Sequence, residues 1–116
     1  MTQPNATPQM SQLLHVSAVI TGVPGSGDRL QEMLVELMVG THAEAGCLLY
    51  SLQRALANPD QFVTVEKWTT QQALDEHLTS PHVQAALAGA GEILAGPPMI
   101  IATLPVAAGD AAKTGY

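Results

Sequence analysis

The chain has 116 residues, which is enough for one domain with a single hydrophobic core but not for two. Hydrophobic residues make up 47% and charged residues 12%, which excludes a disordered chain, and no run approaches the roughly 20 apolar residues of a membrane-spanning helix. Ten acidic against four basic residues give a net charge of −6, which argues against nucleic acid or an anionic membrane as a partner.

Both ends of the chain are predicted to be flexible tails. Residues 1–12 mix Pro, Gln, Asn and Thr, and residues 107–116 lack any periodicity, so we place the folded domain at residues 13–106. The first twelve residues also lack the basic and apolar regions of a secretory signal, and a single cysteine can form no internal disulfide. We therefore expect a cytoplasmic protein.

The first half of the domain predicts a strand followed by a helix. Residues 13–21 are rich in β-branched and aliphatic side chains and end at a Gly-Val-Pro-Gly turn, which is typical of a strand. Apolar residues then recur at helical spacing across 30–38, with Gly40 or Gly46 as the predicted end of the helix.

The second half predicts a hairpin, two short helices and a final strand. Residues 47–54 and 62–68 both alternate at period two, so we expect them to pair as an antiparallel hairpin. Thr69 with Gln72 forms a capping box for a short helix that ends at Leu78, and Ser80-Pro81 begins another helix. Residues 99–106 are predicted to form the last strand.

This order is β-α-β-β-α-β with the second helix broken. It predicts an α+β, ferredoxin-like fold, the split βαβ plan, with a four-stranded antiparallel sheet. The helices can cover one face of such a sheet, whereas the strands carry apolar residues on both faces. We therefore expect a homodimer that packs sheet face against sheet face.

Several common functional motifs are absent or incomplete. Residues 22–27 (GVPGSG) resemble a phosphate loop, but Asp28-Arg29 stands where that loop needs Lys and then Ser or Thr. Cys47 has no neighbouring base and is expected to act as a small apolar group. No two of the histidines form a metal-binding pair such as HxxxH, so we expect no metal site; they are His15, His42, His77 and His82.

Glu66 is the charged residue that most needs an explanation. Strand alternation places it on the same face as Phe62 and Trp68, where its carboxylate loses water and needs a partner. His77 or His82 could supply that partner, and such a pair could move a proton. The alternative is a structural hydrogen bond that ties helix to sheet. Trp68 likewise could belong to the core or stack on a flat ligand.

Four fragments in this order resemble the antibiotic biosynthesis monooxygenase (ABM) family of dimeric α+β barrels. They are AGCLLYSL at 45–52, Pro59 with Phe62, EKW at 66–68, and ALDEHLTSPH at 73–82. They match the family's Gly-Cys-x-x-Tyr strand, its Phe-x-x-x-Glu-x-Trp strand and its His-x-x-Ser-x-His junction. The resemblance extends over residues 13–106.

The resemblance implies a chemistry and a pocket. Members of the family oxidise polycyclic phenols or hydroquinones with O₂, without flavin, haem or metal, in a pocket between sheet and helices; others isomerise small sugars or degrade haem. By resemblance, Glu66, Trp68, His77 and His82 border this pocket. Haem-degrading members place an Asn on the first strand and a His in the last helix, and residues 16–19 and 84–87 contain neither.

We therefore predict a cofactor-independent monooxygenase that oxidises a small phenolic or quinol substrate, with a histidine as the base. The catalytic candidates are His77, Glu66 and His82. The candidates for substrate contact are Trp68, Phe62 and Tyr50. The alternative is a non-catalytic dimeric ligand-binding or stress-response protein of the same fold, in which Glu66 and His77 are structural.

Overall fold

A computed structural model describes residues 13–114 of the chain. Its elements are β1 (Leu14–Thr21), α2 (Gly27–His42), β2 (Cys47–Arg54), β3 (Gln61–Trp68), α3 (Gln71–Leu78), α4 (Pro81–Ala90), β4 (Met99–Thr103) and α5 (Ala111–Thr114). This order confirms the predicted ferredoxin-like α+β fold, including the break between α3 and α4. Within the described range, no helix combines the length and the hydrophobicity needed to cross a membrane.

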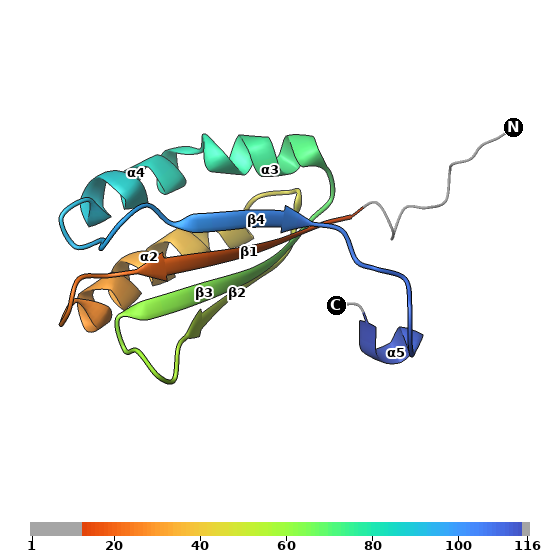
Figure 1. Ribbon diagram of the computed structural model, residues 1–116. Helices are drawn as coiled ribbons and strands as arrows, with labels where there is room; N and C mark the ends of the chain where they lie inside the picture. Colours follow the sequence, from red (N-terminus) through yellow and green to blue (C-terminus); the bar gives the residue numbers. More distant parts are fainter. Residues whose placement is uncertain (1–12, 115–116) are drawn as a thin grey trace, which may run out of the picture.

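The four strands form one sheet in the order β2-β3-β1-β4, and each neighbouring pair is antiparallel. Figure 1 shows α3 and α4 following one another along the sheet, with α2 behind the strands. The strand boundaries follow the alternating sequence pattern closely. The predicted last strand is the exception, because β4 ends at Thr103 rather than at residue 106.

The sheet register places Phe62 and Glu66 on one face of the sheet, as the alternating pattern predicts. Val16 lies opposite Glu66, Ala18 opposite Thr64 and Ile20 opposite Phe62. Directly opposed residues of antiparallel strands point to the same side of the sheet. All six are buried, so the helices cover this face.

The core beneath the helices has two parts. The apolar cluster consists of buried Ile20, Leu30, Leu34, Phe62 and Ala90. The mixed cluster consists of Val16, Tyr50, Trp68 and Leu74 together with the buried polar residues Thr64, Glu66 and His77. Hydrophobic burial therefore dominates at one end of the sheet, and buried polar groups are concentrated toward the other.

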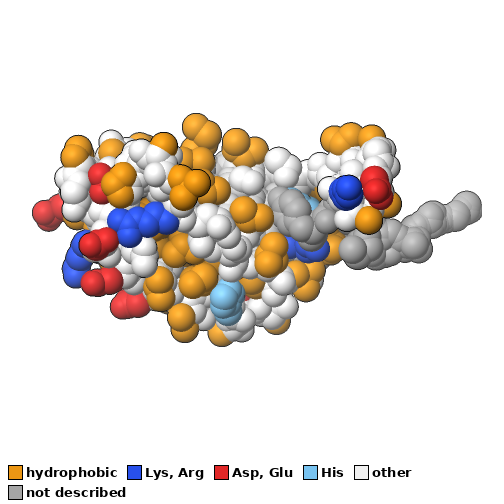
Figure 2. Space-filling view, turned by 90° about the horizontal axis from the view of Figure 1, so that it is seen from below, with side chains coloured by type: hydrophobic (Ala, Val, Ile, Leu, Met, Phe, Trp, Pro, Cys, Tyr) orange, Lys and Arg blue, Asp and Glu red, His pale blue; other side chains and the backbone are white. Residues whose placement is uncertain are grey.

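Helix α2 starts earlier and ends later than the apolar pattern predicts. Its start is stabilised from the β2–β3 hairpin, because the Asp60 carboxylate accepts hydrogen bonds from the backbone N–H of Gly27 at 2.8 Å and of Gly25 at 3.1 Å. Arg54 pairs with Asp28 at 3.1 Å in the same region. In Figure 2, acidic and basic side chains gather at the left end of the molecule, where α2 begins. The helix then runs through Gly40, one of its two predicted ends, to His42.

The structure describes most of the predicted C-terminal tail but not the predicted N-terminal one. Residues 1–12 lie outside the described part of the chain. Within the predicted C-terminal tail, residues 111–114 form the one-turn helix α5, where the Asp110 carboxylate accepts a hydrogen bond from the N–H of Ala112 at 2.9 Å.

The sheet face opposite the helices carries the second set of strand residues. Val19, Val63 and Val65 on this face are half-buried, and Met99 and Ile101 at the β4 edge are exposed. The predicted pairing of this face with a second copy stays a prediction.

Candidate active site

A cavity of about 130 Å³ lies between the covered face of the sheet and helices α2, α3 and α4. Most of its lining side chains are apolar, among them Ala18, Leu34 and Ala86. The polar side chains in its wall are Tyr50, Glu66 and His77. The cavity is therefore an apolar space with polar groups from β2, β3 and α3.

Glu66 is held by its own strand. Its side chain accepts hydrogen bonds from the Thr64 hydroxyl at 2.6 Å and from the Trp68 indole Nε1 at 2.9 Å. These two residues stand two positions before and after it, so alternation places all three on one face. Each carboxylate oxygen has a donor, which compensates for the burial of a residue that is only 4% exposed.

His77 lies on α3, whose N-terminal capping residue is Thr70. The Thr70 side chain accepts a hydrogen bond from the N–H of Ala73 at 3.0 Å, so Thr70 rather than the predicted Thr69 caps the helix. The His77 ring packs on Trp68, with ring centroids 4.6 Å apart, and on Tyr50 at 5.9 Å. This packing holds the imidazole in the wall of the cavity.

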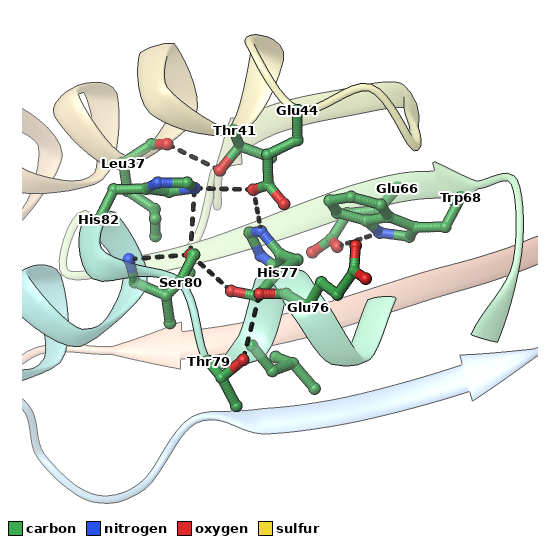
Figure 3. Close-up of polar contacts among 12 residues, drawn as sticks. Leu37, Thr41, Glu44, Glu66, Trp68, Glu76, His77, Thr79, Ser80 and His82 are labelled. Atoms are coloured by element: carbon green, nitrogen blue, oxygen red, sulfur yellow. Dashed lines mark hydrogen bonds and ion pairs between the residues drawn. The ribbon is translucent and has the colours of Figure 1, made fainter. Parts of the chain in front are cut away.

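Glu44 connects the two predicted histidines (Figure 3). One of its carboxylate oxygens, Oε2, lies 2.7 Å from His77 Nδ1 and 2.7 Å from His82 Nε2. A carboxylate accepts, so each of these ring nitrogens carries the hydrogen. In the neutral imidazole of His77, Nε2 then bears the free lone pair, and no group within residues 13–114 bonds it.

Ser80 and Gly40 place His82 for this contact. The Ser80 hydroxyl donates to the His77 carbonyl at 2.6 Å and lies 3.2 Å from His82 Nε2, while Pro81 occupies the first turn of α4 as predicted. A Cβ atom at Gly40 would come within 2.9 Å of the His82 ring. The glycine within α2 therefore makes room for His82.

The predicted hydrogen bond between Glu66 and an imidazole is wrong. Both histidines bond Glu44, and Glu66 receives its donors from Thr64 and Trp68. The carboxylate on the strand is satisfied by neighbours two residues away, whereas α3 and α4 meet the loop after α2. Sequence reasoning missed Glu44, which has no periodic pattern around it and lies 33 positions before His77.

The substrate-contact candidates fall into two groups. Tyr50 lines the cavity. Phe62 and Trp68 are fully buried in the apolar and mixed clusters, beside the cavity rather than among the residues of its wall. His82 also lies outside that wall and borders a second pocket between α2 and α4. Trp68 and His82 thus contact the side chains that do line the cavity.

The surroundings of Tyr50 and Cys47 keep both groups protonated. Burial raises the pKa of the Tyr50 hydroxyl, and the charge of Glu66 adds to the effect. Burial, followed by Glu44 and Glu66, likewise raises the pKa of the Cys47 thiol. Tyr50 therefore remains a hydrogen-bond donor, and Cys47 lacks the thiolate character of a nucleophile.

Glu44, His77 and His82 are also the kinds of residue that bind metals. Each offers one ligand atom, and these atoms lie within 4.8 Å of one another, a group that the sequence spacing did not predict. However, both nitrogen-to-oxygen distances are those of charge-assisted hydrogen bonds. Hydrogen bonding accounts for the arrangement, and we assign no metal to it.

The sheet order, the broken second helix and the cavity beneath it define a ferredoxin-like α+β protein with an apolar pocket between sheet and helices. Residues 13–89 match the family model described as antibiotic biosynthesis monooxygenase, and the chain belongs to this family. The resemblance seen in the sequence is thereby confirmed.

One curated relative and two solved structures are similar to this chain over most of its length. The chain is 32% identical over 83 residues to "Putative monooxygenase Rv0793" of Mycobacterium tuberculosis, covering 72% of this chain and 81% of that protein. The structure of Rv0793 superposes with a TM-score of 0.75 at 28% identity, covering 84% of this chain and 99% of that one. PA3566 from Pseudomonas aeruginosa gives a TM-score of 0.79 at 30% identity, covering 86% and 100% of the two chains.

Proposed function

We propose that this protein is a cofactor-independent monooxygenase that oxidises a small phenol or hydroquinone with O₂. The observation that carries the proposal is the His77 imidazole in the cavity wall, whose Nδ1 is engaged by Glu44 and whose Nε2 is left to accept a proton. Membership of the antibiotic biosynthesis monooxygenase family and the name of the mycobacterial relative support the reaction class.

The size and lining of the cavity favour a substrate with one ring. Its volume is about 130 Å³, and apolar protein cavities of roughly 150 Å³ are known to bind benzene. A polycyclic substrate would need much more space. The mostly apolar lining also offers water few hydrogen-bond partners, which favours reaction of a bound carbanion-like phenolate with O₂.

His77 acts as the general base in this proposal. Its Nε2 removes the hydroxyl proton, and the phenolate then gives an electron to O₂. The resulting radical pair joins to form a ring-carbon hydroperoxide, to which the proton returns. Loss of water leaves a quinone. One phenol and one O₂ thus yield one quinone and one H₂O, and the phenol supplies all four electrons.

Glu44 and His82 are positioning residues. The Glu44 carboxylate fixes the tautomer of His77 and balances the charge of the imidazolium that forms, in the manner of the carboxylate in a catalytic triad. His82 bonds the same Oε2 atom and so holds Glu44 in place. Glu66, fixed by Thr64 and Trp68, is a further carboxylate in the cavity wall.

The proposal includes a homodimer formed through the open face of the sheet. The half-buried valines Val19, Val63 and Val65 and the exposed Met99 and Ile101 give this face an apolar character. Sedimentation velocity at micromolar concentration should give a dimer, and Val65→Asp should give a folded monomer. A monomeric native protein would contradict this part of the proposal.

Oxygen uptake tests the reaction. The native protein, with EDTA and without flavin or reductant, should consume one O₂ per quinone formed from methylhydroquinone or 4-ethylphenol, above the rate without protein. With ¹⁸O₂, one labelled oxygen should enter the product. His77→Ala should lower kcat/KM at least tenfold, since a general base contributes ~10² to 10⁴-fold.

The matched control is Cys47→Ser, which should leave the rate nearly unchanged because the thiol has no step in the reaction. Circular dichroism and sedimentation verify that each variant keeps its fold and assembly. Full activity in folded His77→Ala would exclude His77 as the base. Ligand binding by the native protein without oxygen uptake would favour the non-catalytic alternative.

A further inference from the structure

Two buried polar atoms in the cavity wall lack protein partners. The side chain of Tyr50 is almost fully buried, and its hydroxyl makes no hydrogen bond within the described residues; the hydrogen bond of Tyr50 with His42 at 2.8 Å uses the backbone carbonyl. His77 Nε2 is the second such atom. Proteins rarely leave buried polar groups unpaired, because such a group has lost its hydrogen bonds to water without gaining others. Both atoms therefore indicate a ligand that carries a hydroxyl group.

The rest of the cavity extends away from these atoms along β1. Val16, opposite Glu66, and then Ala18 and Ile20 line it in turn, and four residues of a strand span roughly 13 Å. At the Ile20 end the wall is formed by Leu30 and Ala90 of the apolar cluster. The cavity is thus polar at one end and apolar at the other.

We propose that the cavity binds a phenol with a single hydroxyl group and a short alkyl substituent, its hydroxyl at Tyr50 and His77 and its substituent along β1 toward Ala90. The identity of the ring as a phenol rests on the proposed function. A second hydroxyl at the far side of the ring would enter the apolar end, where no lining side chain could pair with it.

Tyr50 and His77 have complementary roles toward the ligand hydroxyl. The Tyr50 hydroxyl, kept protonated by burial and by Glu66, donates to the ligand oxygen, while His77 Nε2 accepts the ligand's proton. After proton transfer both groups donate to the phenolate oxygen. Tyr50 thereby binds the reactive form of the ligand as well as the neutral one.

Binding under nitrogen tests the proposal without turnover. The probes are phenol and its 4-ethyl, 4-propyl, 4-butyl and 4-hexyl derivatives, with Kd measured by calorimetry and by the fluorescence of Trp68, the single tryptophan, which packs on His77. Each added methylene should lower Kd about 4-fold until the cavity is filled. Hydroquinone should bind no more tightly than phenol.

Variants locate the two ends of the ligand. Ala90→Leu should weaken binding of 4-propylphenol and 4-butylphenol at least tenfold and leave phenol unchanged. Its control is Ala88→Leu, an exposed position on the same helix that does not line the cavity. Tyr50→Phe should raise Kd for every phenol by a similar factor of about 2 to 12, with no effect on propylbenzene.

A Kd that does not depend on chain length, or equal effects of Ala90→Leu and Ala88→Leu, would overturn the inference. Should Ala90→Leu fail to fold, the chain-length series on the native protein still decides. Tight binding of alkylphenols without oxygen uptake would contradict the proposed monooxygenase while supporting this binding mode.

Discussion

The apolar and mixed clusters lie under the same helices on the same sheet face but are stabilised differently. In the apolar cluster, Leu30 and Phe62 are held by hydrophobic burial alone, apart from Arg54, whose guanidinium lies 5.3 Å from the Phe62 ring. In the mixed cluster, Glu66 and His77 are buried only because each has hydrogen-bond partners. The first cluster therefore contributes hydrophobic stabilisation, whereas the second contains the groups to which the proposed reaction assigns a role, at a cost in polar burial.

Glu44→Gln should have the largest effect on the reaction rate relative to its effect on stability, and so should distinguish the two clusters most clearly. Glutamine removes the negative charge that balances the His77 imidazolium formed in the proposed reaction, and its amide group offers one acceptor and one donor to the two imidazoles that share Oε2 in the native protein. We expect kcat to fall by about 10² to 10⁴-fold, as for the equivalent change in catalytic triads, with a small change in unfolding free energy. Oxygen uptake and urea unfolding measure the two quantities. His82→Ala, which leaves the bond between Glu44 and His77 intact, should reduce kcat much less; equal losses would contradict the assigned role of Glu44.

Phe62→Ala should have the opposite profile. Phe62 is 1% exposed and lies outside the cavity wall. Its truncation should lower the unfolding free energy by about 3 to 5 kcal/mol. The kcat/KM of the folded fraction should fall by a smaller factor than in Glu44→Gln. If Phe62→Ala is as stable as the native protein, hydrophobic burial in the apolar cluster does not determine the stability of the core.

Thr64→Val tests the polar part of the mixed cluster. Valine has nearly the shape of threonine but removes one of the two donors to the buried Glu66 carboxylate. The unfolding free energy should fall by about 1 to 3 kcal/mol. In Thr64→Val/Glu66→Leu most of that loss should be recovered, because neither polar group remains. If the single variant is as stable as the native protein, Glu66 does not depend on this bond.

The smallest expected effect is a pH dependence from Tyr50. Its pKa is raised in the folded state, so folding keeps a proton that the unfolded chain loses above about pH 10. This stabilisation is fully present below about pH 10, and the unfolding free energy should fall by ~1.4 kcal/mol per pH unit above it. Urea unfolding between pH 9 and 11.5 should show a shallower decline for Tyr50→Phe. Identical slopes would contradict the burial of the hydroxyl.

The sequence predicts the scaffold well because period-two and helical patterns report directly on burial. Alternation correctly placed Phe62, Thr64, Glu66 and Trp68 on the covered face, and Ser80-Pro81 correctly marked the start of α4. The partners of these residues were harder to predict. Glu44 reaches His77 from a loop, and Asp60 stabilises the start of α2 from a hairpin turn. Such contacts depend on how elements pack and leave no local pattern.

The central claim is that Glu44 holds His77 with its hydrogen on Nδ1, leaving Nε2 as the base. Long-range ¹H–¹⁵N correlation spectra of the imidazoles, with the His77 signals assigned by their loss in His77→Asn, report the tautomer without any substrate. The account predicts the Nδ1–H tautomer for neutral His77 in the native protein and its loss in Glu44→Ala, in which no carboxylate accepts that hydrogen. A neutral His77 with its hydrogen on Nε2 in the native protein would contradict the account.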